Sequence, residues 1–118
     1  MTEDQAVTEI NIKTGMPVVD EALRRFDAAL AGARKSPCVI MKVIHGYGSS
    51  GPGGKIRTGL HRHLEALLRT GRIKAFVPGD RWDIFDAGAR ELLDICGDLR
   101  DDTDLGRFNR GVTLVRIR

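Results

Sequence analysis

The feature that most constrains the fold is an apolar run followed at once by a glycine-rich stretch and then by an amphipathic segment. Residues 38–44 read CVIMKVI, a nearly continuous and partly β-branched run typical of a strand buried on both faces. Residues 45–55 read HGYGSSGPGGK, in which six of the eleven residues are glycine or proline. Apolar residues then recur at helical spacing over residues 54–70. A buried strand that leads through such a loop into a helix favours an α/β fold.

The remaining periodicities extend this pattern along the chain. They predict strands over residues 8–13, 72–77 and 112–117, a helix from Pro17 to about Arg34, and a shorter helix that begins after Asp83 and ends at Gly97. We therefore expect an α/β fold, a single compact two-layer domain with the order β-α-β-α-β-(α)-β and a mixed four-stranded sheet, because the last strand can run antiparallel to its neighbour. The expected domain covers residues 8–118 after a flexible tail, residues 1–7, and carries an enlarged acidic helical segment at residues 79–110.

Within that segment, Asp83 is the expected N-cap of the third helix, and Trp82 near Phe85 is the expected hydrophobic staple. The inward positions of this helix are predicted to be Phe85, Ala89, Leu92 and Cys96.

The cysteines and the chain start favour a cytoplasmic protein. Cys38 and Cys96 lack metal-site spacing and are expected to be buried thiols in a reducing compartment. The N-terminal residues are acidic and polar, unlike a signal peptide, and no apolar run approaches the ~20 residues of a membrane span. We expect no membrane partner.

Charge is distributed unevenly along the chain. Residues 55–78 carry six basic residues and one acidic residue, a net charge of +5, whereas residues 79–104 carry nine acidic and three basic residues, a net charge of −6. Residues 105–118 carry four arginines and no acid, or +4. A partner would therefore meet one basic face and one acidic face.

Two nucleotide-binding motifs fit the glycine-rich stretch poorly. A P-loop needs G-x-x-x-x-G-K-[ST], but Ser49 replaces the first glycine and Ile56 replaces the hydroxyl residue that would bind Mg²⁺. The segment GYGSSG does match G-x-G-x-x-G, but the only acidic residue ~20 positions later is Glu65, inside a predicted helix.

A more general interpretation is an anion site, because a glycine-rich loop before a helix exposes backbone N–H groups and the positive helix pole. The residues expected to contribute are Gly46, Tyr47, Gly48, Ser49, Ser50, Gly53, Gly54 and Lys55.

A basic row continues from this loop along the predicted second helix. Lys55, Arg62 and Arg69 are spaced by seven residues and share one side of the helix, whereas Arg57 and His61 lie on the opposite flank. Such a row suits a chain of phosphates better than a single phosphate. The alternative interpretation is an ordinary solvated helix face.

These residues resemble a known family, the small MutS-related (Smr) domain. The resemblance rests on the His-Gly-x-Gly sequence at residues 45–48, on Gly53-Gly54 and Ile56-Arg57, and on the closing segment NRGVTLVRI. It implies a compact α/β domain that binds DNA or RNA. Some members cleave nucleic acid as endonucleases, and some are attached to ATPases of mismatch repair or recombination, which implies a role in DNA repair.

The first strand departs from the family pattern. Cleaving members carry Leu-Asp-x-His there, and the matching residues here are Ile10-Asn11-Ile12-Lys13. Asn11 cannot accept a proton. Lys13 is a poor base unless buried, but it is a catalytic candidate because it offers charge stabilisation or a phosphate contact. The resemblance therefore leaves enzyme activity open. A divalent metal is implied only if the chain is a nuclease.

Several single residues keep two interpretations. His45 is a candidate general acid or base, or else shapes the loop through hydrogen bonds. Tyr47 either stacks on a base or anchors the loop, and His61 either contacts phosphate or is merely solvated. His63 lies on the apolar face and is expected to be half-buried. The alternative function is a protein-interaction module that docks a repair or translation factor through the acidic segment.

Overall fold

A computed structural model describes residues 6–47 and 52–118, and it confirms the α/β class and the mixed four-stranded sheet. The elements follow the predicted order: β1 (Val7–Asn11), α1 (Val19–Arg34), β2 (Ile40–Ile44), α2 (Pro52–Arg69), β3 (Ala75–Pro78), α3 (Ala87–Ile95) and β4 (Val112–Arg116). Two short 3-10 helices, η2 (Gly79–Arg81) and η3 (Gly97–Asp101), flank α3.

The sheet has the strand order β1-β2-β4-β3. β1 pairs with β2 in parallel, and β4 lies antiparallel between β2 and β3. The last strand is thus antiparallel to its neighbours, as its sequence position allowed. The C-terminal ends of β1, β2 and β3 and the N-terminal end of β4 therefore meet at one edge of the sheet.

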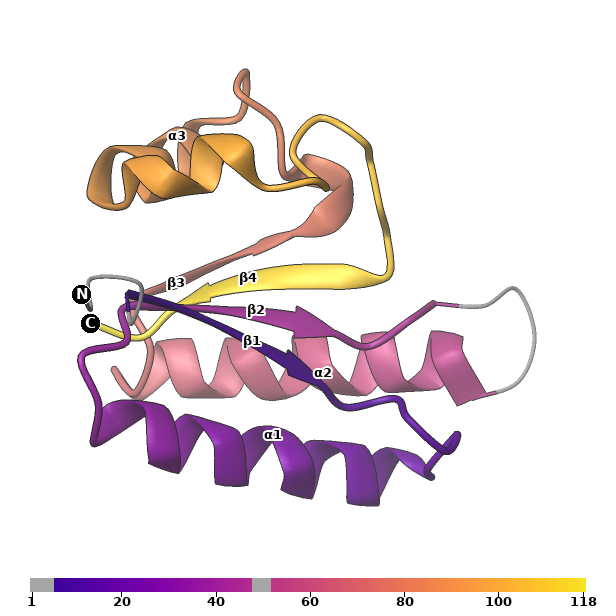
Figure 1. Ribbon diagram of the computed structural model, residues 1–118. Coiled ribbons are helices and arrows are strands. Elements are labelled where there is room, and N and C mark those ends of the chain that lie inside the picture. The colour runs from indigo at the N-terminus through magenta and orange to yellow at the C-terminus, as the bar shows by residue number, and fades with distance from the viewer. Residues whose placement is uncertain (1–5, 48–51) are drawn as a thin grey trace.

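The expectation of two layers is wrong, because helices cover both faces of the sheet (Figure 1). On one face, α1 and α2 pack against a core that includes Met41 and Val43 of β2. On the other face, α3 and η3 form a second core with Ile40 of β2. The alternation of side chains along β2 thus supplies both cores, which explains why that strand reads as continuously apolar.

The two long helices owe their position to single apolar stripes. In α1 the buried residues are Ala22, Phe26, Leu30 and Ala33, and Asp20 and Glu21 lie in its first turn, where acidic groups favour the helix dipole. In α2 the buried stripe consists of Ile56, Leu60 and Leu64. His63 is half-buried as predicted, and its Nε2 lies 2.7 Å from Oδ1 of Asp27.

The start of α3 differs from the prediction. The N-cap is Asp86, whose Oδ2 accepts a hydrogen bond from the backbone N–H of Ala89 at 3.0 Å. Asp83 instead accepts from the N–H of Phe85 in the turn before the helix. Phe85 is consequently 82% exposed rather than inward-facing. Aspartate is an equally good N-cap at either position, so residue type alone could not distinguish Asp83 from Asp86 as the cap of α3.

Trp82 is not a staple for α3, since Phe85 points into solvent. Trp82 is buried in the second core, and its Nε1–H donates to Oδ2 of Asp102 at 3.0 Å. A buried indole is expected to find such a partner for its N–H group.

A buried ion cluster attaches the acidic segment to the sheet. Lys42 of β2 is 7% exposed in its side chain, and its Nζ lies 2.8 Å from Asp102 Oδ1 and 2.6 Å from Asp104 Oδ2. Burial acts to lower the pKa of Lys42, but the bonds to both carboxylates outweigh it and raise that pKa. Two of the nine acids of residues 79–104, Asp102 and Asp104, are therefore paired with a buried lysine of the sheet.

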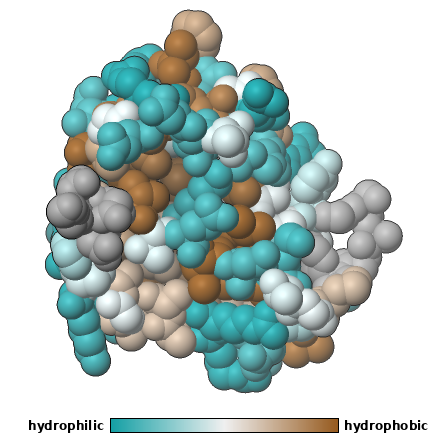
Figure 2. Space-filling view, in the orientation of Figure 1, coloured by the Kyte–Doolittle hydropathy of each residue, from teal (hydrophilic) through white to brown (hydrophobic). Residues whose placement is uncertain are grey.

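The surface in the orientation of Figure 1 is largely hydrophilic, with hydrophobic patches between, including some over the α3 layer (Figure 2). Among the described residues no helix is both long and apolar enough to cross a membrane. Cys38 is buried and Cys96 is half-buried, and both are free thiols.

Candidate nucleic-acid interface

The candidate site lies at the sheet edge where three strands end and β4 begins. The segments after β1, β2 and β3 and the residues before β4 all reach this edge, and α2 starts beside it (Figure 1). Crevices beyond the carboxyl ends of strands are the usual ligand sites of α/β sheets.

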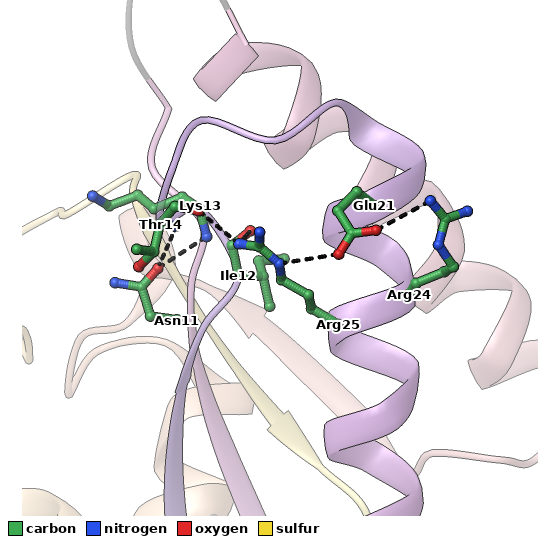
Figure 3. Close-up of polar contacts among 7 residues, drawn as sticks. All are labelled: Asn11, Ile12, Lys13, Thr14, Glu21, Arg24 and Arg25. Carbon is green, nitrogen blue, oxygen red and sulfur yellow. Dashed lines mark hydrogen bonds and ion pairs between the residues drawn. The ribbon is translucent and has the colours of Figure 1, made fainter.

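The turn after β1 is built by Asn11 (Figure 3). Its Oδ1 accepts hydrogen bonds from the backbone N–H groups of Lys13 at 2.9 Å and Thr14 at 3.2 Å, which makes an Asx turn. Arg25 of α1 fixes the turn from the other side, because its guanidinium donates to the Thr14 carbonyl at 2.7 Å and pairs with Glu21 at 3.4 Å. The role of Asn11 is thus to shape the backbone.

This turn places Lys13 against the glycine that follows β2. Lys13 is exposed, and its Cδ would lie 3.0 Å from a Cβ built on Gly46. Gly46 has a φ of +69°, in the left-handed region that glycine tolerates best. The segments after the first and second strands thus bring a lysine and the His-Gly segment close together.

His45 is completely buried and holds the edge together. Its backbone N–H and that of Gly46 both donate to the Gly111 carbonyl, at 2.9 and 3.0 Å. In its ring, Nδ1 lies 2.6 Å from the carbonyl oxygen of Gly46, and Nε2 lies 2.9 Å from Oγ1 of Thr113. Both ring nitrogens are therefore engaged.

His61 of α2 reaches the same hydroxyl, with 2.9 Å between its Nε2 and Thr113 Oγ1. Its ring lies edge-on to His45, with 5.7 Å between centroids. His61 is thus half-buried, which corrects the expectation that it is exposed. The sequence could not show this, because the partner Thr113 lies 52 residues away.

If both rings are neutral, the Thr113 hydroxyl fixes the direction of each hydrogen bond between His45, Thr113 and His61. A carbonyl only accepts, so His45 carries its proton on Nδ1, and its bare Nε2 accepts the Thr113 hydroxyl proton. The hydroxyl has one proton to donate, so His61 must donate from Nε2 to Oγ1.

The electrostatics agree with neutral rings. Burial, and then the nearby Arg57 charge, lower the pKa of His61 to about 4. Burial is also the main cause that lowers the pKa of His45, again aided by Arg57.

Arg57 is the charged group of this cluster. Its guanidinium lies 3.7 Å from Oδ1 of Asp80 in η2, and its Nε is buried without a hydrogen-bond partner among the described residues. A buried unsatisfied donor is costly, and a bound ion or a functional role is among the explanations for such a group. Sequence analysis missed Thr113 and Asp80; only the presence of a threonine within an aliphatic strand hinted at the former.

The basic row of α2 is confirmed as a surface feature. Lys55, Arg62 and Arg69 are all exposed, on the side away from the buried stripe, at successive rises of about 10.5 Å. Glu65 is exposed between them. Gly53 and Gly54 lie in the first turn of α2, which begins at Pro52, and Tyr47 is 47% exposed. The predicted loop residues Gly48, Ser49 and Ser50 lie outside the described residues.

Comparison with solved structures identifies this architecture. The chain is similar to the Smr domain of Thermus thermophilus MutS2, with 24% sequence identity, a TM-score of 0.57, and coverage of 94% of this chain and 98% of that domain. The fold is therefore that of an Smr-like domain. No family model matches the sequence, and no curated protein does.

Proposed function

We propose that this chain binds nucleic acid, with phosphates contacting the sheet edge and the basic row of α2. The observation that carries the proposal is the exposed row Lys55, Arg62 and Arg69, which begins where three strands end. A solvated helix face needs no alignment with that edge. The Smr-like fold, for which nucleic-acid binding is the expected activity, supports the same conclusion.

The first phosphate would lie over the start of α2. Helix N–H groups at Gly54, the exposed Lys13, whose aliphatic stem lies beside Gly46, and the partly exposed guanidinium of Arg57 are the candidate donors. Backbone N–H groups of the glycine-rich stretch that follows Gly46 would supply further donors, and the row would guide the strand along α2.

The test is a titration of labelled duplex and single-stranded DNA and RNA at several salt concentrations. The double variant Lys55→Glu/Arg62→Glu should weaken binding to all sequences alike. If both residues contact phosphates of duplex DNA, the slope of log K against log salt, which is negative, should become less steep by about 1.8.

A matched control changes the net charge by the same amount elsewhere. Arg90 and Arg100 are exposed in the α3 layer, so Arg90→Glu/Arg100→Glu should leave the slope nearly unchanged. Glu65→Gln should tighten binding, because it removes the acid within the row. Equal losses of affinity in both double variants would show that net charge causes the effect, and would refute the proposed binding surface on α2.

Phosphodiester cleavage is a second candidate, favoured by the two histidines with lowered pKa at this edge. His45 would have to release the Thr113 hydroxyl before its Nε2 could accept a proton. If His45 acts so, His45→Gln should abolish nicking of supercoiled DNA in the presence of divalent metal and retain binding. Undiminished nicking would exclude this role.

The alternative of a protein-docking module is weakened by the buried pairing of Asp102 and Asp104 with Lys42, which leaves less free acidic surface. A complex captured from cell extract that survives nuclease treatment and contains one stoichiometric protein would favour it over binding to nucleic acid.

A further inference from the structure

The loop before β4 carries an exposed aromatic residue in an unfavourable backbone conformation. Phe108 has a φ of +55° and is 63% exposed. Bulky side chains rarely occupy the left-handed region, and Gly or Asn would adopt it at lower cost. Burial cannot compensate for the cost, because most of the ring faces solvent. Strain that packing does not explain is a feature of functional positions.

The loop that holds Phe108 is firmly anchored. Asn109 donates from Nδ2 to Asp104 Oδ1 at 2.8 Å, and its Oδ1 accepts from the Gly111 N–H at 2.8 Å. The Gly106 N–H donates to the Trp82 carbonyl at 2.8 Å. Asp104 in turn pairs with the buried Lys42, so the loop is attached to the sheet on both sides of Phe108. The ring is therefore presented to solvent by a fixed backbone.

This loop reaches the same edge as the proposed phosphate site. Gly111 bonds to His45 and Gly46, and Gly46 Cα lies 3.4 Å from a Cβ built on Gly111. Tyr47 follows that contact by one residue and Phe108 precedes it by three. With 3.8 Å between successive Cα atoms, the Cα atoms of the two aromatic residues are at most about 20 Å apart. One strand of nucleic acid could contact both.

Cationic residues flank Phe108 in the sequence. Arg107 and Arg110 are exposed on either side of Phe108, and Lys13 lies across the Gly46 contact. An aromatic face beside cations is the combination that binds single strands, since the ring stacks on bases while the cations contact phosphates. A duplex hides its base faces and offers only backbone and groove edges.

We propose that Phe108, with Tyr47, stacks on unpaired bases, so that the ligand of this edge is single-stranded or locally unpaired nucleic acid. This inference rests on the proposed function and adds strandedness to it. It also explains why a bulky, exposed residue occupies a backbone position that glycine or asparagine would adopt at lower cost.

The experiment compares three probes by fluorescence anisotropy: a single strand with bases, the same strand made of abasic sugars, and the matching duplex, each in DNA and the first also in RNA. The wild-type protein should bind a base-bearing strand more tightly than the abasic strand. Phe108→Asn should weaken binding to the base-bearing strand by about 5- to 150-fold, the loss expected for one stacked base. It should leave abasic binding unchanged.

Two controls separate stacking from folding. Phe108→Asn should keep or raise the melting temperature, because asparagine tolerates the left-handed conformation. Leu68→Ala removes a 41%-exposed apolar side chain near the far end of α2, and should alter no affinity.

Equal binding of base-bearing and abasic strands by the wild-type protein would overturn the inference, as would unaltered affinity of Phe108→Asn or binding of duplex alone. In each of those cases a normal effect of Lys55→Glu/Arg62→Glu would leave the proposed function intact. Absence of binding to every probe would refute both.

Discussion

Acidification should destabilise the protein through His61. The native ring is held neutral by burial and by Arg57, which lower its pKa from 6.5 to about 4. The unfolded chain has the ordinary pKa, so between pH 6.5 and 4 it binds a proton that the folded protein does not. Stability contributed by the neutral ring is therefore present above pH 6.5 and is lost as the pH falls toward 4.

The magnitude follows from the pKa difference. Each pKa unit corresponds to about 1.4 kcal/mol, and over the interval from pH 7 to pH 5 the full difference would remove about 2 kcal/mol. The ring is only half-buried, so solvent screening reduces this to about 1 kcal/mol. For a domain of this size that corresponds to a fall of roughly 4 °C in melting temperature.

The assay is urea unfolding at pH 7 and pH 5 for the wild type and His61→Gln. Glutamine can still donate to the Thr113 hydroxyl but cannot titrate, so the variant should lose about 1 kcal/mol less on acidification. The comparison cancels the titrating groups that do not contact His61. An identical loss in both proteins would refute the neutral, buried state assigned to His61.

Two further predictions concern the supports of the site. Lys42→Met should lower the free energy of unfolding by about 3–5 kcal/mol, because Asp102 and Asp104 would remain enclosed without a cation; a loss below 1 kcal/mol in urea unfolding would contradict the cluster's role. Gly79→Ala should lower the free energy of unfolding by roughly 3 kcal/mol, because a Cβ there would lie 1.8 Å from a backbone oxygen of the loop before β4. The control Gly97→Ala, whose Cβ meets nothing within 4 Å, should be nearly neutral in the same assay.

The elements and their order could be predicted because they depend on local periodicity. The continuous apolar character of residues 38–44 correctly indicated a strand buried on both faces. A strand buried on both faces needs a covering layer on each side of the sheet, so the expectation of only two layers was inconsistent with this prediction. Within the acidic segment, Ala89 and Leu92 were correctly predicted to face inward, whereas the places of Trp82 and Leu99 in the same core were not predicted.

The candidate site was predictable only in part. The basic row of α2 is a single-helix pattern, and its exposure followed from the buried stripe opposite. The histidine pair was not predictable, because it depends on Thr113 from a strand far along the chain. The conformation of Phe108 is equally invisible in sequence, since nothing in its neighbours demands a positive φ.

The most direct test of the central claim is the salt dependence of binding to one duplex DNA by the wild type and by the Lys55→Glu/Arg62→Glu and Arg90→Glu/Arg100→Glu variants. The account predicts that only Lys55→Glu/Arg62→Glu makes the negative slope of log K against log salt less steep, by about 1.8. A slope that is the same in all three proteins would show that phosphates do not follow the α2 row.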